Sequence, residues 1–149
     1  MGSRSLGVMG CLVLGTAVTV ASAVGVEIGQ IKAVTGDVRI IRENVQRPAK
    51  AGDLLEQADT VVTGAESSVG ITFIDNSRFS VGPNSRIALE QFRFDPTTHE
   101  GAFLTKMHRG TLAIISGQIA SRTPDAMQVQ TPTSILGVRG TKFLVKVEE

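Results

Sequence analysis

The chain has 149 residues, a formal net charge of +1 and a single cysteine. Its 15 Lys and Arg residues nearly balance its 14 Asp and Glu residues, so it has no basic excess to neutralise nucleic-acid phosphates. Trp and Tyr are absent, which weakens the case for a surface that stacks on sugars or bases. We therefore expect one domain and no nucleic-acid partner.

The N-terminal residues have the three parts of a secretory signal peptide. Arg4 is the only charge before Glu27, an apolar run covers residues 6–20, and the small residues Ala21 and Ala23 stand where signal peptidase cleaves. We predict a signal-peptide helix over residues 1–23, cleavage after Ala23, and a mature domain over residues 24–149.

Two alternatives compete for this N-terminal segment. A transmembrane anchor needs about 20 apolar residues, and the run here is shorter and lacks a charged stop. Cys11 faintly resembles a lipoprotein acylation site, but most of the apolar run follows it. We expect a periplasmic or secreted protein that has no membrane-spanning segment after cleavage, and no cysteine, because Cys11 leaves with the signal peptide.

The rest of the chain has the alternating pattern of β-strands. Strands are expected at 28–34, 38–41, 59–63, 69–74, 79–81, 87–94, 102–107, 112–115, 127–131, 135–138 and 142–147. Residues 44–50 are expected to form a polar turn, and residues 118–125 a helical turn or a longer loop, because Pro124 interrupts the alternation there.

About ten short strands separated by Gly, Pro, Asn and Asp every 8–12 residues favour an all-β domain. We predict a β-sandwich or jelly-roll-like domain. A short β-helix is the alternative, because units of a glycine turn and a strand recur, although irregularly.

Turn residues recur along the chain in a fixed order. The structural positions of this pattern are Gly36, Asp37, Gly52, Asp53, Asp59, Thr63, Gly64, Asp75, Ser77, Pro83, Ser85, Gly110, Thr131, Pro132, Gly137, Arg139, Gly140, Thr141 and Phe143. In this order and spacing they resemble the FecR domain of bacterial envelope proteins, over residues 29–147. The segment Gly137-Val138-Arg139-Gly140-Thr141-Lys142-Phe143 is the most specific part of this resemblance.

The resemblance implies an all-β periplasmic or secreted domain without a known catalytic centre. The founding type of the family is a membrane-spanning regulator of iron transport. It receives a signal from an outer-membrane receptor and passes it to a cytoplasmic sigma factor. Because the apolar run of this chain begins at residue 6, we expect the chain to share with the founding type only its sensing or binding domain.

The ionisable residues do not form a recognisable catalytic or metal-binding pattern. His99 and His108 lack the spacing of metal ligands, and we expect no metal and no cofactor. The acids that flank glycines or strand ends suit turn hydrogen bonds better than a catalytic carboxylate pair. They are Asp37, Asp53, Asp59 and Asp75. We therefore predict that the protein is not an enzyme.

Arg139, between Gly137 and Gly140, has two interpretations. In the first interpretation, the Arg139 side chain pairs with a carboxylate such as Asp53 or Asp75 and holds the turn in place. In the second, it contacts an anionic ligand or partner. The sequence leaves both open.

The function expected is a non-catalytic binding or signal-sensing domain that acts through an envelope protein partner. The alternative is a structural or surface module that binds envelope polysaccharide or protein.

Overall fold

The computed structural model describes residues 2, 15, 26–138 and 142–148, and these contain twelve strands and one short helix. The strands are β1 (Glu27–Thr35), β2 (Val38–Arg42), β3 (Val45–Pro48), β4 (Leu54–Glu56), β5 (Thr60–Thr63), β6 (Ser68–Phe73), β7 (Arg78–Val81), β8 (Arg86–Phe94), β9 (Gly101–Ile115), β10 (Met127–Gln130), β11 (Ile135–Gly137) and β12 (Lys142–Val147). The helix α1 covers Gln118–Arg122.

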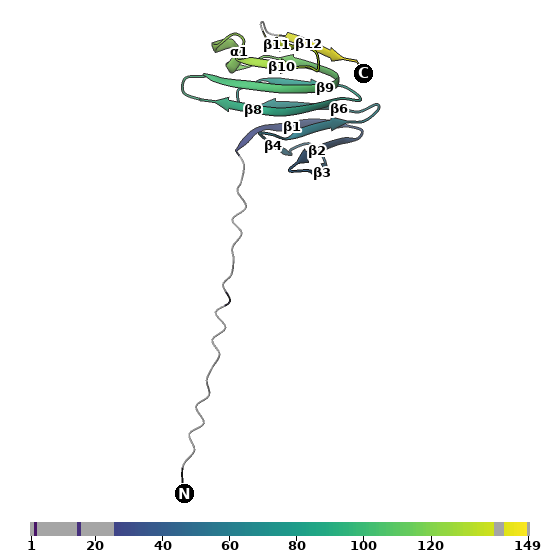
Figure 1. The fold of residues 1–149 in the computed structure, drawn as a ribbon, viewed down its shortest axis with the longest axis vertical. Coiled ribbons are helices and arrows are strands. Elements are labelled where there is room, and N and C mark those ends of the chain that lie inside the picture. Colours follow the sequence, from purple (N-terminus) through teal and green to yellow (C-terminus); the bar gives the residue numbers. More distant parts are fainter. Residues whose placement is uncertain (1, 3–14, 16–25, 139–141, 149) are drawn as a thin grey trace.

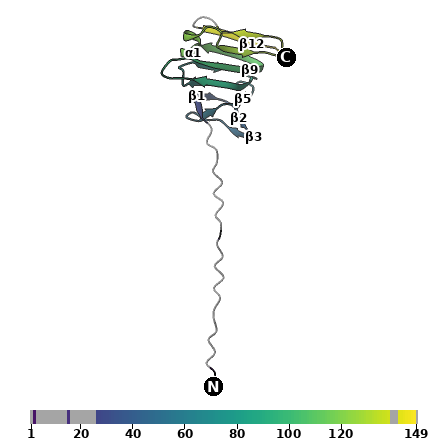
Figure 2. The same cartoon turned by 60° about the vertical axis from the view of Figure 1, so that its left-hand side comes forward.

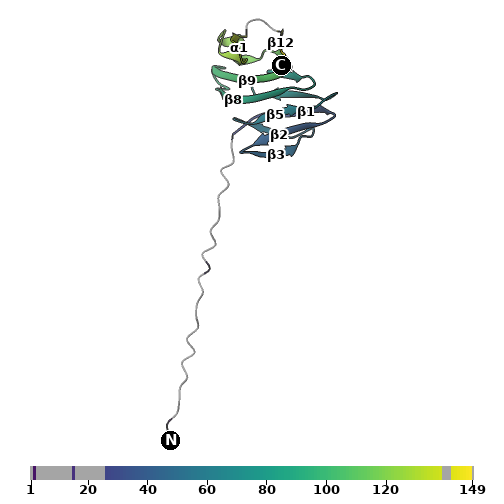
Figure 3. The same cartoon turned by 45° about the vertical axis from the view of Figure 1, so that its right-hand side comes forward.

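The strands form one curled sheet in the order β3-β2-β5-β8-β9-β7-β6-β1-β4. β10 and β12 also pair with β9, and β11 pairs with β10. All pairs are antiparallel except β9 with β10. Figures 1, 2 and 3 show α1 and β12 at one end of the domain and β3 at the other.

The long strand β9 divides this sheet into two halves. Its C-terminal part pairs with β7 and β12, which with β6, β1 and β4 we call sheet I. Its N-terminal part pairs with β8 and β10, which with β5, β2, β3 and β11 we call sheet II. The change of partners falls at Gly110, whose φ of 99° is in the region that glycine tolerates best.

The hydrophobic core lies between the two sheets. Phe73 and Phe79 come from sheet I, and Phe92 and Phe103 come from sheet II. The Phe73 ring meets the Phe103 ring edge to face, with 4.7 Å between centroids, and stacks on Phe92 at 6.0 Å. Alternating residues such as Ile71 and Ile87 fill the space around these rings.

The all-β class is confirmed, and the antiparallel pairing rules out a β-helix. Two predictions of strand bounds were wrong. The strands expected at 102–107 and 112–115 are one strand, because Gly110 bends β9 without ending it. Residues 45–48, expected to be a turn, form the edge strand β3 because they pair with β2.

The helical turn expected near residue 118 is α1. The signal-peptide helix predicted over residues 1–23 falls outside the described residues apart from Gly2 and Gly15. No helix within the described part of the chain is both long and apolar enough to cross a membrane.

Candidate functional site

Asp59 lies directly before β5 and forms a buried ion pair with Arg42. The Arg42 guanidinium donates to its two carboxylate oxygens from Nε at 2.8 Å and from Nη2 at 2.7 Å. The Glu56 N–H also donates to it, at 2.8 Å. The Asp59 side chain is only 1% exposed, and its hydrogen bond raises the pKa of Arg42. Because Arg42 also pairs with Glu56 at 3.3 Å, it joins β2 of sheet II to β4 of sheet I.

Thr63, Ser85 and Gly110 meet at a second cluster. Thr63 Oγ1 donates to the Gly82 carbonyl at 2.6 Å and accepts from the Ser85 N–H at 2.9 Å. Ser85 Oγ accepts from the Thr111 N–H and donates to the Pro83 carbonyl. A Cβ at position 110 would lie 2.0 Å from Ser85 Oγ, so these strands approach closely only because residue 110 is glycine.

Asp75 and Ser77 form a third cluster in the β6–β7 turn. Asp75 accepts from the Ser77 N–H at 3.0 Å and from the Ser77 hydroxyl at 2.7 Å. Ser77 Oγ in turn accepts from the Gly117 N–H, and the Asp75 carbonyl accepts from the Gln118 N–H. Both side chains are fully buried, and their bonds fasten the start of α1 to the turn.

The other positions of the pattern lie at separate turns. Gly36 has a φ of 73°, the Gly64 N–H donates to the Asp37 carbonyl, and Asp37 pairs with Arg39 on the surface. Gly52 has a φ of 96°, and Asp53 accepts from the Lys50 N–H.

The C-terminal positions are only partly described. Thr131 bonds to Ser134 around the exposed Pro132, and a Cβ on Gly137 would meet Asp125. Phe143 packs against the core. Arg139, Gly140 and Thr141 are outside the described residues, so the two interpretations of Arg139 stay predictions.

The two histidines lie in different surroundings. His99 is in the exposed β8–β9 loop, where its ring stacks on Phe94 at 6.1 Å. His108 is on β9, and its pKa is lowered by partial desolvation and by the charges of Arg86 and Lys106. Within the described residues, no three His, Cys, Asp or Glu side chains converge as a metal site would require.

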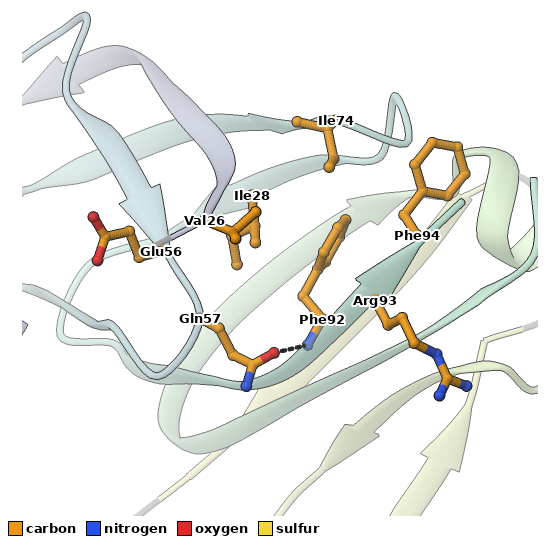
Figure 4. Close-up of a pocket in the computed structure, with 8 residues that line it drawn as sticks. All are labelled: Val26, Ile28, Glu56, Gln57, Ile74, Phe92, Arg93 and Phe94. Atoms are coloured by element: carbon orange, nitrogen blue, oxygen red, sulfur yellow. Dashed lines mark hydrogen bonds between the residues drawn. The ribbon is translucent and has the colours of Figure 1, made fainter. Parts of the chain in front are cut away.

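An apolar groove of about 420 Å³ lies between β1, the first strand of sheet I, and the end of β8. We call it the β8 groove. It is lined by Val26, Ile28, Glu56, Gln57, Ile74, Phe92, Arg93 and Phe94 (Figure 4). In Figure 4, Val26, Ile28 and Phe92 face one another, and the Arg93 guanidinium points away from them.

Three features define what the β8 groove offers a ligand. Val26 is 78% exposed and Ile74 is 50% exposed, so large aliphatic side chains face solvent at its rim. The Phe92 N–H donates to Gln57 Oε1 at 3.2 Å, so a side chain takes the place of a neighbouring strand at this edge of β8. Glu56, its only carboxylate, is paired with Arg42. The groove thus offers apolar contact and a strand edge.

The sequence did not predict this groove. Val26, Ile28 and Phe92 fit ordinary strand alternation, and they come from segments far apart in the chain. The available signal was Ile74, an apolar residue at the outward position directly after Phe73 and just before a turn.

Fold and site together define an all-β domain with an open apolar groove at a strand edge. The chain belongs to the FecR family, since the model of that family, described as FecR protein, matches residues 59–149. This is a family of signalling-related domains in envelope regulation and not a known class of enzyme. No curated protein matches the chain, and no solved structure matches it.

Proposed function

We propose that the protein is an exported, non-catalytic binding domain in envelope signalling, and that an envelope protein inserts an extended apolar segment into its β8 groove. The supporting observation is the edge of β8. There, Gln57 bonds to a backbone N–H that a strand would otherwise pair with, directly beside the apolar walls.

An extended peptide suits this site for two reasons. Main-chain hydrogen bonds to a sheet edge give affinity, and alternate side chains of the added strand enter pockets that give specificity. Here the pockets are apolar, because Ile28, Ile74 and Phe94 line the wall. Membership of a signalling family supports a protein as the occupant.

A photo-crosslinking amino acid at position 94 tests this proposal in intact cells. We expect one discrete crosslinked protein, lost when Ile74→Asp places a charge in the groove. The control is the same amino acid at Ile135, which is 62% exposed on β11 and does not line the groove. The same adduct from both positions, or capture of envelope glycan alone from position 94, would overturn the proposal.

The export step is part of the same proposal. We propose that residues 1–23 are removed and that residues 24–149 work in the periplasm or outside the cell. N-terminal sequencing of the protein purified from the envelope should begin at Val24. A chain that retains Met1, or that stays in the cytoplasm, would contradict this step while leaving the groove open to test.

A further inference from the structure

The outer face of sheet I is formed by two rows of residues in strand register. One row crosses six strands in register, from β4 through β1, β6, β7 and β9 to β12. It consists of Leu54, Gln30, Thr72, Arg78, Ile115 and Lys142. The next row consists of Ala33, Gly70, Ser80, Ala113 and Leu144. Residues in register point to the same side, so the two rows form one surface.

Positive charge collects on this surface although the whole chain is nearly neutral. Arg78, Lys142 and Lys146 are exposed on it, and Lys32 lies beside Gln30, to which its Nζ donates at 2.8 Å. The segments 29–35, 68–73, 78–81, 110–115 and 142–147 contain no Asp or Glu, and the acid of this face is Glu27, which lies near Lys32 and Leu54 at the β4 edge, away from Arg78, Lys142 and Lys146. Among the described residues, Glu148 pairs with Lys146 at 3.2 Å, at the end of β12.

Large apolar side chains stand among these cations. Leu144 is 68% exposed, Leu54 is 41% exposed and Ile115 is 39% exposed. The sheet surface between these three side chains lies lower than they do, because Gly70, Ser80 and Ala113 have small side chains or none. Cations around exposed aliphatic side chains on a broad, low surface match an interface of anionic headgroups with acyl chains below them.

We propose that the outer face of sheet I docks on an anionic lipid bilayer, with Arg78, Lys142 and Lys146 at the phosphates and Leu144 and Ile115 entering the headgroup region. A bilayer fits better than a glycan because no aromatic ring for sugar stacking occurs on the two rows. It fits better than a small anion because the cations are spread over β1, β7 and both ends of β12 and do not converge on one point.

Vesicle co-sedimentation of the exported protein tests this docking, with phosphatidylglycerol vesicles as the probe and phosphatidylcholine vesicles for comparison. We expect binding to phosphatidylglycerol at low salt, weakening as salt screens the charges. Because one cation near an anionic surface is worth about fivefold in binding, Lys142→Glu with Lys146→Glu should weaken it on the order of 25-fold or more. Arg78→Glu, on another strand, should weaken it independently, and Leu144→Ser should reduce the binding that persists at high salt.

The matched control is Arg39→Glu with Arg86→Glu, which reverses two exposed cations on the outer face of sheet II. It should weaken vesicle binding far less than the double variant of sheet I, because these side chains lie on the opposite face of the domain from the bilayer. All variants share one N-terminus, and circular dichroism verifies their folding.

The proposal is overturned by absence of binding to phosphatidylglycerol at low salt, or by equal losses in the two double variants. Binding to dextran sulfate but not to vesicles, or a dimer that dissociates in Lys142→Glu while vesicles do not bind, would also overturn it. None of these results bears on the β8 groove, whose crosslinking is measured separately.

Discussion

The Arg42 guanidinium donates two hydrogen bonds of 2.8 and 2.7 Å to the Asp59 carboxylate, and the same side chain bridges the seam between β2 of sheet II and β4 of sheet I. Arg42 ends β2, whereas Asp59 follows β4 and precedes β5. Since Arg42 Nη2 also donates to the Leu54 carbonyl at 3.2 Å, one side chain bonds to both sides of this seam.

We predict that Arg42→Ala lowers the free energy of unfolding by about 3–5 kcal/mol, because it leaves the buried Asp59 carboxylate without its cation. Arg39→Ala is the control. Its pair with Asp37 is 49% and 62% exposed and is worth about 0–1 kcal/mol. Urea unfolding of both variants measures the difference, and losses of equal size would refute the role given to Arg42.

Gly110→Ala should destabilise the domain far more than Gly52→Ala. Both glycines have a positive φ, which costs another residue about 1–2 kcal/mol. The space around Gly52 is open, whereas a Cβ on residue 110 would lie 2.4 Å from the Cα of Ser85. Thermal unfolding compares the two variants. Ser85→Ala should not rescue Gly110→Ala, because the Ser85 backbone atoms cause much of the clash.

Thr105→Val should stabilise the protein by about 1 kcal/mol, because it removes a buried hydroxyl and keeps the shape of the side chain. Thr105 lies on β9 between Leu89 and Val129, and its Oγ1 has no hydrogen-bond partner among the described residues. Urea unfolding measures the gain. A loss of stability would contradict the prediction, because a hydroxyl without a partner contributes nothing to stability when buried.

His108 should titrate below the ordinary pKa of a histidine, about 6.5. Partial desolvation lowers the pKa of His108 the most, and the positive charges of Arg86 and Lys106 lower it further. The negative charge of Glu90 raises it. Since the unfolded chain then binds more protons, stability should decline as the pH falls through 6.5. NMR titration should show the pKa of His108 rising in Lys106→Gln, and an unchanged pKa would contradict the assigned cause.

Truncation before Thr141 should unfold the domain. It removes β12, which pairs with β9 over six residues and buries Val145 to 5% exposure. The control ends the chain after Val147, which keeps β12 whole. Circular dichroism and thermal melting distinguish the two, and a cooperative transition in the shorter chain would show that β12 is dispensable.

The sequence alone predicted the all-β class, most of the strands and the FecR resemblance. These depend on local signals, because alternation and turn residues act within a few positions of one another. Asp75 and Ser77 show this, since their turn was expected at the place where the structure has it.

Only the tertiary structure decided which distant segments meet. Residues 45–48 become a strand because β2 lies beside them, and β9 stays continuous through Gly110 because both sheets pair with it. The β8 groove joins Val26, Ile74 and Phe94, and the face of sheet I joins Arg78 to Lys142. Such contacts depend on strand register across the whole sheet, which no short stretch of sequence specifies.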